Sequence, residues 1–127
     1  MLKEIIISIL VIVLIFTLDF FLQNYTKDSV EVMTGKLEIL RENLLKKDEE
    51  AILNNMQDIN NNWEDIQYKL SFFIEHNEIE KVKTNLVALE GDIQVKQYDV
   101  SISELNKSIF VLEHISDKYA FNLVNIF

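Results

Sequence analysis

The two histidines of the chain occur in matching contexts, each directly after a glutamate that closes an apolar phrase. The phrases are Phe72-Phe73-Ile74-Glu75-His76 and Phe110-Val111-Leu112-Glu113-His114. Carboxylate and imidazole groups can bind a divalent metal, and an imidazole also gains or loses its charge near neutral pH. If both phrases end helices that point the same way, Glu75, His76, Glu113 and His114 are a weak candidate for a metal site or a pH-sensitive contact.

A simpler interpretation of these histidines needs no metal. A histidine near the carboxyl end of a helix interacts favourably with the last carbonyl groups and with the helix dipole. We favour this interpretation and predict neither a metal nor any other cofactor.

The remaining polar residues do not combine into a catalytic arrangement. Acidic neighbours such as Glu49-Glu50 and Glu64-Asp65 point about 100° apart on a helix, so they cannot act as a carboxylate pair. The absence of cysteine excludes thiol chemistry and disulfides, and the two glycines, Gly35 and Gly91, cannot build a phosphate-binding loop. We therefore predict no catalytic residue and a protein that is not an enzyme.

Four aromatic residues are candidates for contact with a partner: Trp63, Tyr119, Phe121 and Phe127. Trp63 is the only tryptophan, and it lies in an apolar run, so the core is its default place. The other three belong to the apolar C-terminal stretch 115–127. An apolar chain end is usually docked, and we favour docking on the protein's own helices over contact with a partner or a membrane.

Acidic residues dominate the charge of the chain. Lys and Arg number 12 and Asp and Glu number 21, which gives a formal net charge of -9. Nucleic acids and anionic headgroups both attract basic side chains, so neither is an expected partner of the polar part of the chain. The simplest role of the charge is solubility.

Residues 5–22 form an apolar stretch interrupted only by Ser8, Thr17 and Asp19. Its length is at the short end of the range for a helix that spans a bilayer, which needs about 20 residues. A cleaved signal peptide would have a shorter apolar core and a small-residue cleavage site, and a buried core helix would carry a polar face. We predict a retained anchor over residues 1–25 that crosses the cell membrane once.

Basic residues on both sides of this stretch leave its orientation open. Lys3 and the amino terminus precede it, and Lys27, Lys36 and Arg41 follow it. The positive-inside rule weighs such residues near both ends of a span. We favour a cytoplasmic amino terminus and an extracytoplasmic C-terminal domain.

Residues 26–127 show the periodicity of helices. Apolar residues recur in steps of three and four, which places them on one helix face. Short polar intervals between the runs favour antiparallel neighbours. We predict an all-α fold in which an N-terminal transmembrane helix precedes an antiparallel four-helix domain of two helical hairpins, with helices over about 28–46, 48–75, 78–95 and 98–114.

Local signals support the helix starts and indicate a repeat. Asp48 is placed to cap the second helix, and Asn77 with Glu80 has the spacing of a capping box for the third. The repeat has an offset of 49 residues, at which Leu37, Leu40, Leu44, Met56 and Trp63 recur as Leu86, Leu89, Ile93, Leu105 and Leu112. It predicts two hairpins of similar plan.

Several stretches resemble a known family. They are the opening Met-Leu-Lys-Glu-Ile-Ile-Ile, the Trp63-centred helix, Phe73-Ile74-Glu75-His76-Asn77-Glu78-Ile79, Leu86-Val87-Ala88-Leu89, and the ending Leu112-Glu113-His114-Ile115 with Asn122-Leu123-Val124-Asn125-Ile126-Phe127. Over its full length the chain is similar to the clostridial and related Gram-positive proteins grouped as domain of unknown function 4363 (DUF4363). Gly91 and Val95 depart from the residues expected there, which predicts a locally looser third helix.

The resemblance implies a small, membrane-anchored helical protein and gives no activity. It also implies a partnership with membrane proteins of a second uncharacterised family, DUF421. We therefore expect a non-enzymatic interaction domain that is accessory to another membrane or envelope protein, and a homo-oligomer is compatible with that role. The alternative is an extracytoplasmic domain that senses a small ligand or an ion between its stacked hairpins.

Overall fold

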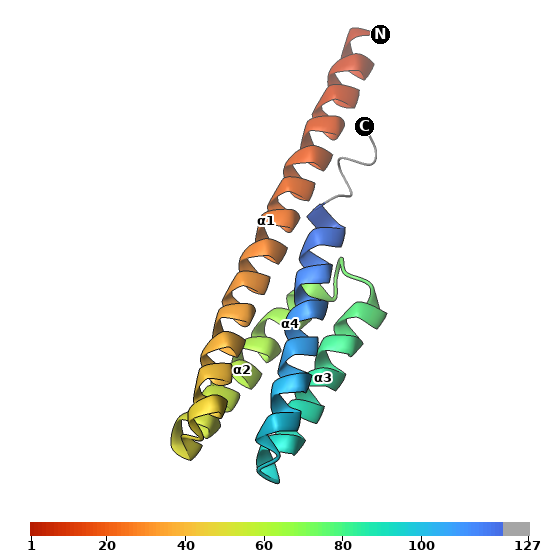
Figure 1. Cartoon of the computed structure of the whole chain (residues 1–127). Helices are drawn as coiled ribbons and strands as arrows, with labels where there is room; N and C mark the ends of the chain where they lie inside the picture. The colour runs from red at the N-terminus through yellow and green to blue at the C-terminus, as the bar shows by residue number, and fades with distance from the viewer. Residues whose placement is uncertain (121–127) are drawn as a thin grey trace.

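Four helices make up the described part of the chain, residues 1–120 of a computed structural model (Figure 1). They are α1 (Leu2–Lys46), α2 (Glu49–Leu70), α3 (His76–Gln94) and α4 (Tyr98–Ala120). Each helix runs antiparallel to the one before it, and α1 also packs against α4, which closes a four-helix bundle. The predicted all-α fold with four antiparallel helices is confirmed.

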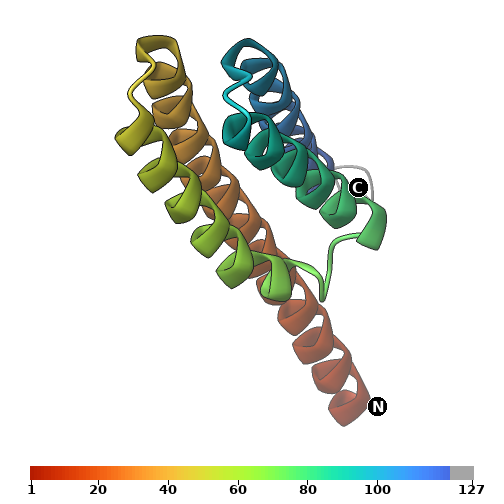
Figure 2. The same cartoon turned by 90° about the horizontal axis from the view of Figure 1, so that it is seen from below.

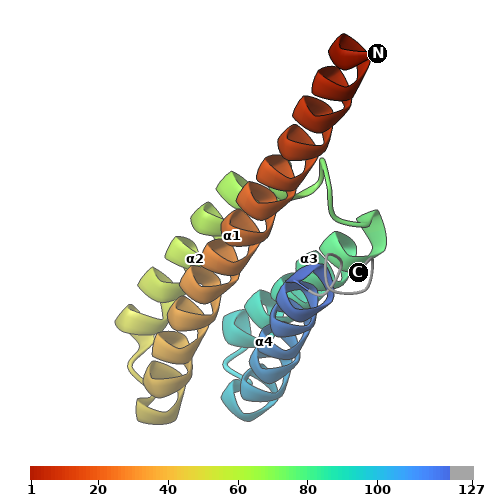
Figure 3. The same ribbon diagram turned by 90° about the horizontal axis from the view of Figure 1, so that it is seen from above.

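The helices pair as two helical hairpins, α1–α2 and α3–α4, that lie side by side (Figure 2). The hairpins meet mainly through α1 and α4, whereas α2 and α3 touch at few places. Both hairpin turns lie at one end of the bundle, which we call the far end. The N-terminal half of α1 projects from the opposite end, the near end, where α2 connects to α3 (Figures 1 and 3).

α1 is one unbroken helix whose two halves lie in different surroundings. From Ile5 to Leu18 every side chain is on the outside, and the apolar residues there cover all sides of the helix. From Thr26 onward the helix buries a regular stripe against α2 and α4. No proline interrupts it, and the helix runs without a break through residues 25 and 26, where the anchor and the helical domain are predicted to meet.

The projecting half satisfies its own polar groups. The hydroxyl groups of Ser8 and Thr17 donate to the carbonyl oxygens of Glu4 and Val13, each at 2.8 Å. Such bonds within the helix remove the cost of placing a hydroxyl group in an apolar medium. By its length and composition alone, α1 is able to cross a membrane.

The two hairpin turns at the far end have the same construction. Lys47 and Lys96 both adopt a left-handed conformation with φ of 57°. The next amide after each lysine, in Asp48 and Gln97, donates to a carbonyl five residues back, at 3.2 and 2.8 Å. This is the Schellman arrangement that satisfies the last carbonyls of a helix. The Asp48 side chain also accepts from Ala51 N–H at 3.2 Å, so the predicted cap of α2 is confirmed.

The connection between α2 and α3 differs from its prediction. α2 ends at Leu70 instead of residue 75, and α3 begins at His76 instead of residue 78. The chain turns because Ile74 folds back into the core while its N–H still donates to the Leu70 carbonyl at 2.9 Å. Glu75, rather than the predicted Asn77, precedes the first turn of α3.

α4 is longer than predicted. It continues past residue 114 to Ala120, because Ile115 extends the buried stripe of Leu105, Ile109 and Leu112 by one further step. Residues 115–120 of the apolar C-terminal stretch are therefore helical. The rest of that stretch, with Phe121 and Phe127, lies outside the described residues.

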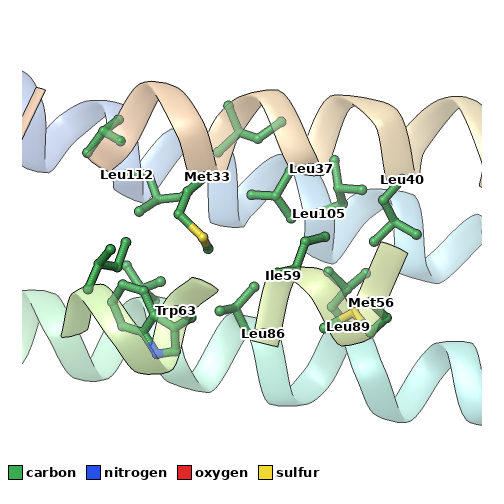
Figure 4. Close-up of a cluster of buried hydrophobic side chains, with 14 of the residues drawn as sticks. Met33, Leu37, Leu40, Met56, Ile59, Trp63, Leu86, Leu89, Leu105 and Leu112 are labelled. Atoms are coloured by element: carbon green, nitrogen blue, oxygen red, sulfur yellow. The ribbon is translucent and has the colours of Figure 1, made fainter. Parts of the chain in front are cut away.

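The core repeats between the hairpins with the predicted offset of 49 residues. Figure 4 shows part of this core, to which all four helices contribute side chains. The buried residues of α1 and α2 have buried counterparts in α3 and α4 in the pairs Val30/Ile79, Met33/Val82, Leu37/Leu86, Leu40/Leu89, Leu44/Ile93, Ile52/Ser101, Met56/Leu105, Ile59/Ser108, Trp63/Leu112 and Ile66/Ile115. Each large side chain in such a core contributes about 1.5–3 kcal/mol by leaving water.

Two of these pairs combine a large side chain in α2 with a small one in α4. α4 carries the small Ser101 and Ser108 where α2 carries Ile52 and Ile59. Both serine hydroxyl groups donate within α4, to the carbonyls of Gln97 and Glu104 at 2.8 and 3.0 Å. Small, internally satisfied side chains allow close backbone approach. α4 packs more closely on α1 than α2 packs on α3.

Candidate functional site

The two Glu–His pairs do not lie where their predicted roles require. His76 is the first residue of α3 and is exposed, with Nε2 at 3.8 Å from Glu80 Oε1. His114 is exposed in the body of α4, six residues before its end. Neither histidine ends a helix, so the helix-dipole interpretation is wrong for both. Within residues 1–120 no three His, Cys, Asp or Glu side chains gather closely enough to hold a metal ion.

Trp63 belongs to the core, as its place in the apolar run predicts. It is 5% exposed and lies among the residues that converge from all four helices (Figure 4). Among residues 1–120 its indole Nε1 has no hydrogen-bond partner, a situation that costs about 1–3 kcal/mol for a buried polar group. Burial makes Trp63 a structural residue of the bundle, which removes it from the candidates for partner contact.

Tyr119 fastens α4 to the start of α3. Its hydroxyl oxygen accepts a hydrogen bond from Glu75 N–H at 2.7 Å, which gives that amide the partner that a capping side chain would otherwise supply. Tyr119 therefore acts inside the domain, as a strap between two helices.

Lys118 strengthens the same junction. Its Nζ lies 3.4 Å from Glu75 Oε2 and 3.9 Å from Glu78 Oε1. Glu78 is only 5% exposed, and Lys81 approaches the same Oε1 at 3.5 Å. The other carboxylate oxygen of Glu78 has no hydrogen-bond partner in the part of the chain that the structure describes. A buried carboxylate must be paired to be tolerated, so these lysines are structural counter-charges.

Aromatic side chains gather at the near end of the bundle. Phe73 meets Tyr25 of α1 edge to face, with ring centroids 6.5 Å apart and planes at 68°. Next to it, Tyr68 and Phe72 pair in the same way at 5.2 Å and 84°. Phe73 also lines a small cleft of about 120 Å³ together with Asp19, Leu22, Gln23, Thr26 and Tyr119.

The pair Tyr68 and Phe72 is the feature that sequence reasoning missed. The two residues are 69% and 73% exposed, although both are large and aromatic. The adjacent residues Phe72 and Phe73 were a signal in the sequence, because an apolar residue outside the buried face of a helix has no place in the core. The position of Phe72 could be interpreted only once it was known that α2 ends at Leu70 beside α1.

Open clefts lie on the outer surface of the α3–α4 hairpin. One, of about 480 Å³, surrounds Phe110, which is 71% exposed, and is lined by Asn85, Ser103, Asn106, Lys107, Phe110 and Val111. A neighbouring one of about 600 Å³ follows the first half of α3 and is lined by Glu75, Asn77, Glu78, Glu80, Lys81, Thr84, Asn85 and Val111. Neither is lined by Trp63. Small-molecule sites enclose most of their ligand, and these open surfaces do not have that shape.

Comparison with known proteins identifies the family. A family model described as Domain of unknown function (DUF4363) matches residues 20–126, which spans the second half of α1 and the rest of the bundle. Neither the curated proteins nor the solved structures contain a match to the chain. The family match covers most of the chain, and the protein therefore belongs to the DUF4363 family.

Proposed function

We propose that this protein is a single-pass, membrane-anchored, non-enzymatic interaction domain that serves another membrane or cell-envelope protein. The observation that carries the proposal is the continuity of α1. Its first half is apolar on every side and its second half is part of the bundle core, with no flexible segment between them. A domain attached in this way is held at a fixed height above the bilayer and in a fixed orientation.

The geometry sets the reach of the domain. From Gln23 to Lys46, α1 extends by about 36 Å at a rise of about 1.5 Å per residue. The hairpin turns at the far end would lie at that distance from the membrane. α2 and α4 pack along this length of α1, so a partner would meet a rigid domain instead of a flexibly tethered one.

The face around Phe110 is the surface on which we propose that the partner binds. An exposed phenylalanine beside Val111, ringed by Asn85, Asn106 and Lys107, has the composition of a small protein-binding surface: an apolar centre with a polar rim. Its groove between two helices would accept an amphipathic segment of a membrane protein.

A crosslinking pull-down through the intact anchor tests this function. Full-length protein and the variant Phe110→Asp would be crosslinked in membranes and the captured proteins identified. Val95→Asp is the matched control, because Val95 is also exposed but lies at the far end of the bundle. We expect one membrane protein to be captured by the parent and the control and lost in Phe110→Asp. Equal capture by all three, or capture only of a second copy of the chain, would contradict the proposed surface.

We propose that the bundle lies on the extracytoplasmic side. Lys3 and the amino terminus would then stay in the cytoplasm, and the acidic bundle would face away from the anionic inner leaflet, which repels it. Protease added to intact cells should remove the bundle if this orientation holds. Full protection, with cleavage only after lysis, would reverse it.

A further inference from the structure

The near end of the bundle lies at the level where the apolar segment of α1 stops. Phe73 packs on Tyr25 and lines the cleft formed by Asp19, Leu22 and Thr26. The connection from α2 to α3 is therefore level with residues 19–26 of α1. Figures 1 and 3 place this connection on the side from which the N-terminal half of α1 projects.

Helix length fixes where that level falls in a bilayer. Residues 5–22 extend about 27 Å at about 1.5 Å per residue, and the hydrocarbon core of a bilayer is about 30 Å thick. A span slightly shorter than the core draws its flanking residues inward. Leu22 and Phe73 beside it would then lie at the boundary between hydrocarbon and headgroups.

Tyr68 and Phe72 stand at this boundary without a place in the core. Both are more than two-thirds exposed, and their rings pack edge to face on each other. On α1, Phe20 and Phe21 are similarly exposed at the same level. Tyrosine is favoured at the headgroup level, where its ring meets acyl chains and its hydroxyl group meets water. Phenylalanine contributes apolar ring surface at the same boundary.

We propose that Tyr68 and Phe72 form a second membrane contact that inserts into the headgroup region beside the anchor. This inference rests on the proposed anchoring, and it adds that α2 and its connection to α3 touch the lipid as well. Two contacts on different helices fix the tilt and rotation of the bundle, which a single span leaves to its surroundings. The contact is made by rings, so it does not require anionic lipid.

The chain lends itself to a direct test because it contains no cysteine. Single cysteines would be introduced by Phe72→Cys, Val95→Cys and Ile12→Cys, each at an exposed position, and labelled with a nitroxide. The full-length protein would be reconstituted in phosphatidylcholine vesicles. Power-saturation measurements would then compare how strongly oxygen, which concentrates in lipid, and a water-soluble nickel chelate relax each label.

Each outcome decides between the hypotheses. We expect the label at position 12 to favour oxygen, the label at 95 to favour the chelate, and the label at 72 to lie between them, with chelate access several-fold lower than at 95. Equal chelate access at 72 and 95, with position 12 in lipid, would overturn the second contact and leave the anchor intact. Protection of position 72 that appears only when a partner protein is present would also overturn it, in favour of a protein interface. Full chelate access at position 12 would overturn the anchoring itself.

Discussion

Lys47 and Lys96 adopt the same left-handed backbone conformation, 49 residues apart, and each closes one of the two helical hairpins. Their amides donate to the carbonyls of Leu44 and Ile93 at 3.2 and 3.0 Å. Those two residues are themselves a pair in the repeated core. The repeat therefore includes the turn geometry as well as the apolar pattern, and it describes the bundle as two copies of one helical hairpin.

The turn at Lys47 predicts a stabilising substitution. A residue with a Cβ loses about 1–2 kcal/mol in the left-handed region, a loss that glycine avoids at some cost in the unfolded chain. Lys47→Gly should raise the free energy of unfolding by about 0.5–1 kcal/mol, measured by denaturant unfolding of the full-length protein in mild detergent. The control Lys46→Gly, inside the last turn of α1, should lower it by up to about 1 kcal/mol. A destabilising Lys47→Gly would contradict the assigned turn.

Trp63 predicts a contrast between two substitutions. Trp63→Ala removes a core side chain and should cost about 3–5 kcal/mol. Trp63→Phe keeps most of the apolar volume and removes the unpartnered indole N–H, so it should cost no more than about 1.5 kcal/mol. Thermal denaturation followed by circular dichroism would measure both. A loss for Trp63→Phe as large as that for Trp63→Ala would mean that the indole nitrogen has a partner in solution.

The hydrogen bond between Glu75 N–H of the α3 start and the Tyr119 hydroxyl group of α4 predicts a local effect on stability. Tyr119→Phe deletes the acceptor for Glu75 N–H and should lower stability by about 1 kcal/mol. Amide hydrogen exchange should quicken first at Glu75 and in the opening turn of α3. Tyr68→Phe, a change at an exposed ring, is the control and should leave exchange in α3 unchanged. Uniform acceleration across all helices in Tyr119→Phe would indicate a global role instead.

Lys96 also connects the two hairpin turns and makes their pairing sensitive to pH. Its Nζ lies 2.9 Å from Glu49 Oε1 at the start of α2. The hydrogen bond to Glu49, and then the charge of that carboxylate, raise the pKa of Lys96 above 10.5. A raised pKa in the folded state stabilises the protein below the unfolded value and loses this effect as pH rises through the folded value.

The stability difference between the parent and Lys96→Gln should therefore be fully present below about pH 10.5 and be lost as pH rises through the higher pKa that Lys96 has in the folded state. Because both side chains are exposed, molar salt should reduce the same difference. Midpoints of thermal unfolding across pH and salt would measure it, with Lys83→Gln on the exposed face of α3 as the control. A difference that grows at high pH would contradict the ion pair.

Apolar spacing was sufficient to predict most of the core. The steps of three and four that predict each helix face, and the offset of 49 residues, reappear in the buried residues of both hairpins. These features depend on local periodicity, which a sequence displays directly. The cap at Asp48 is equally local, since the carboxylate binds an amide only three residues ahead.

The break after Leu70 could not be predicted in the same way. Ser71, Phe72 and Phe73 contain no helix breaker, and the helix ends there because Ile74 is buried and Glu75 N–H binds Tyr119, 44 residues away. Because of these long-range contacts, His76 begins α3, whereas the sequence had predicted it at the end of α2. It also placed Phe72 at the near end of the bundle, which only the three-dimensional arrangement reveals.

We propose that α1 joins a membrane span to the bundle as one rigid helix. This continuity can be measured as the distance between nitroxide labels at Leu10→Cys and Val32→Cys, in the full-length protein in lipid vesicles. The positions are 22 residues apart on similar sides of α1 and exposed, so a continuous helix predicts one narrow distance distribution centred near about 33 Å. A broad distribution, or one centred at a clearly shorter distance, would show a hinge between span and bundle and would rule out the rigid connection.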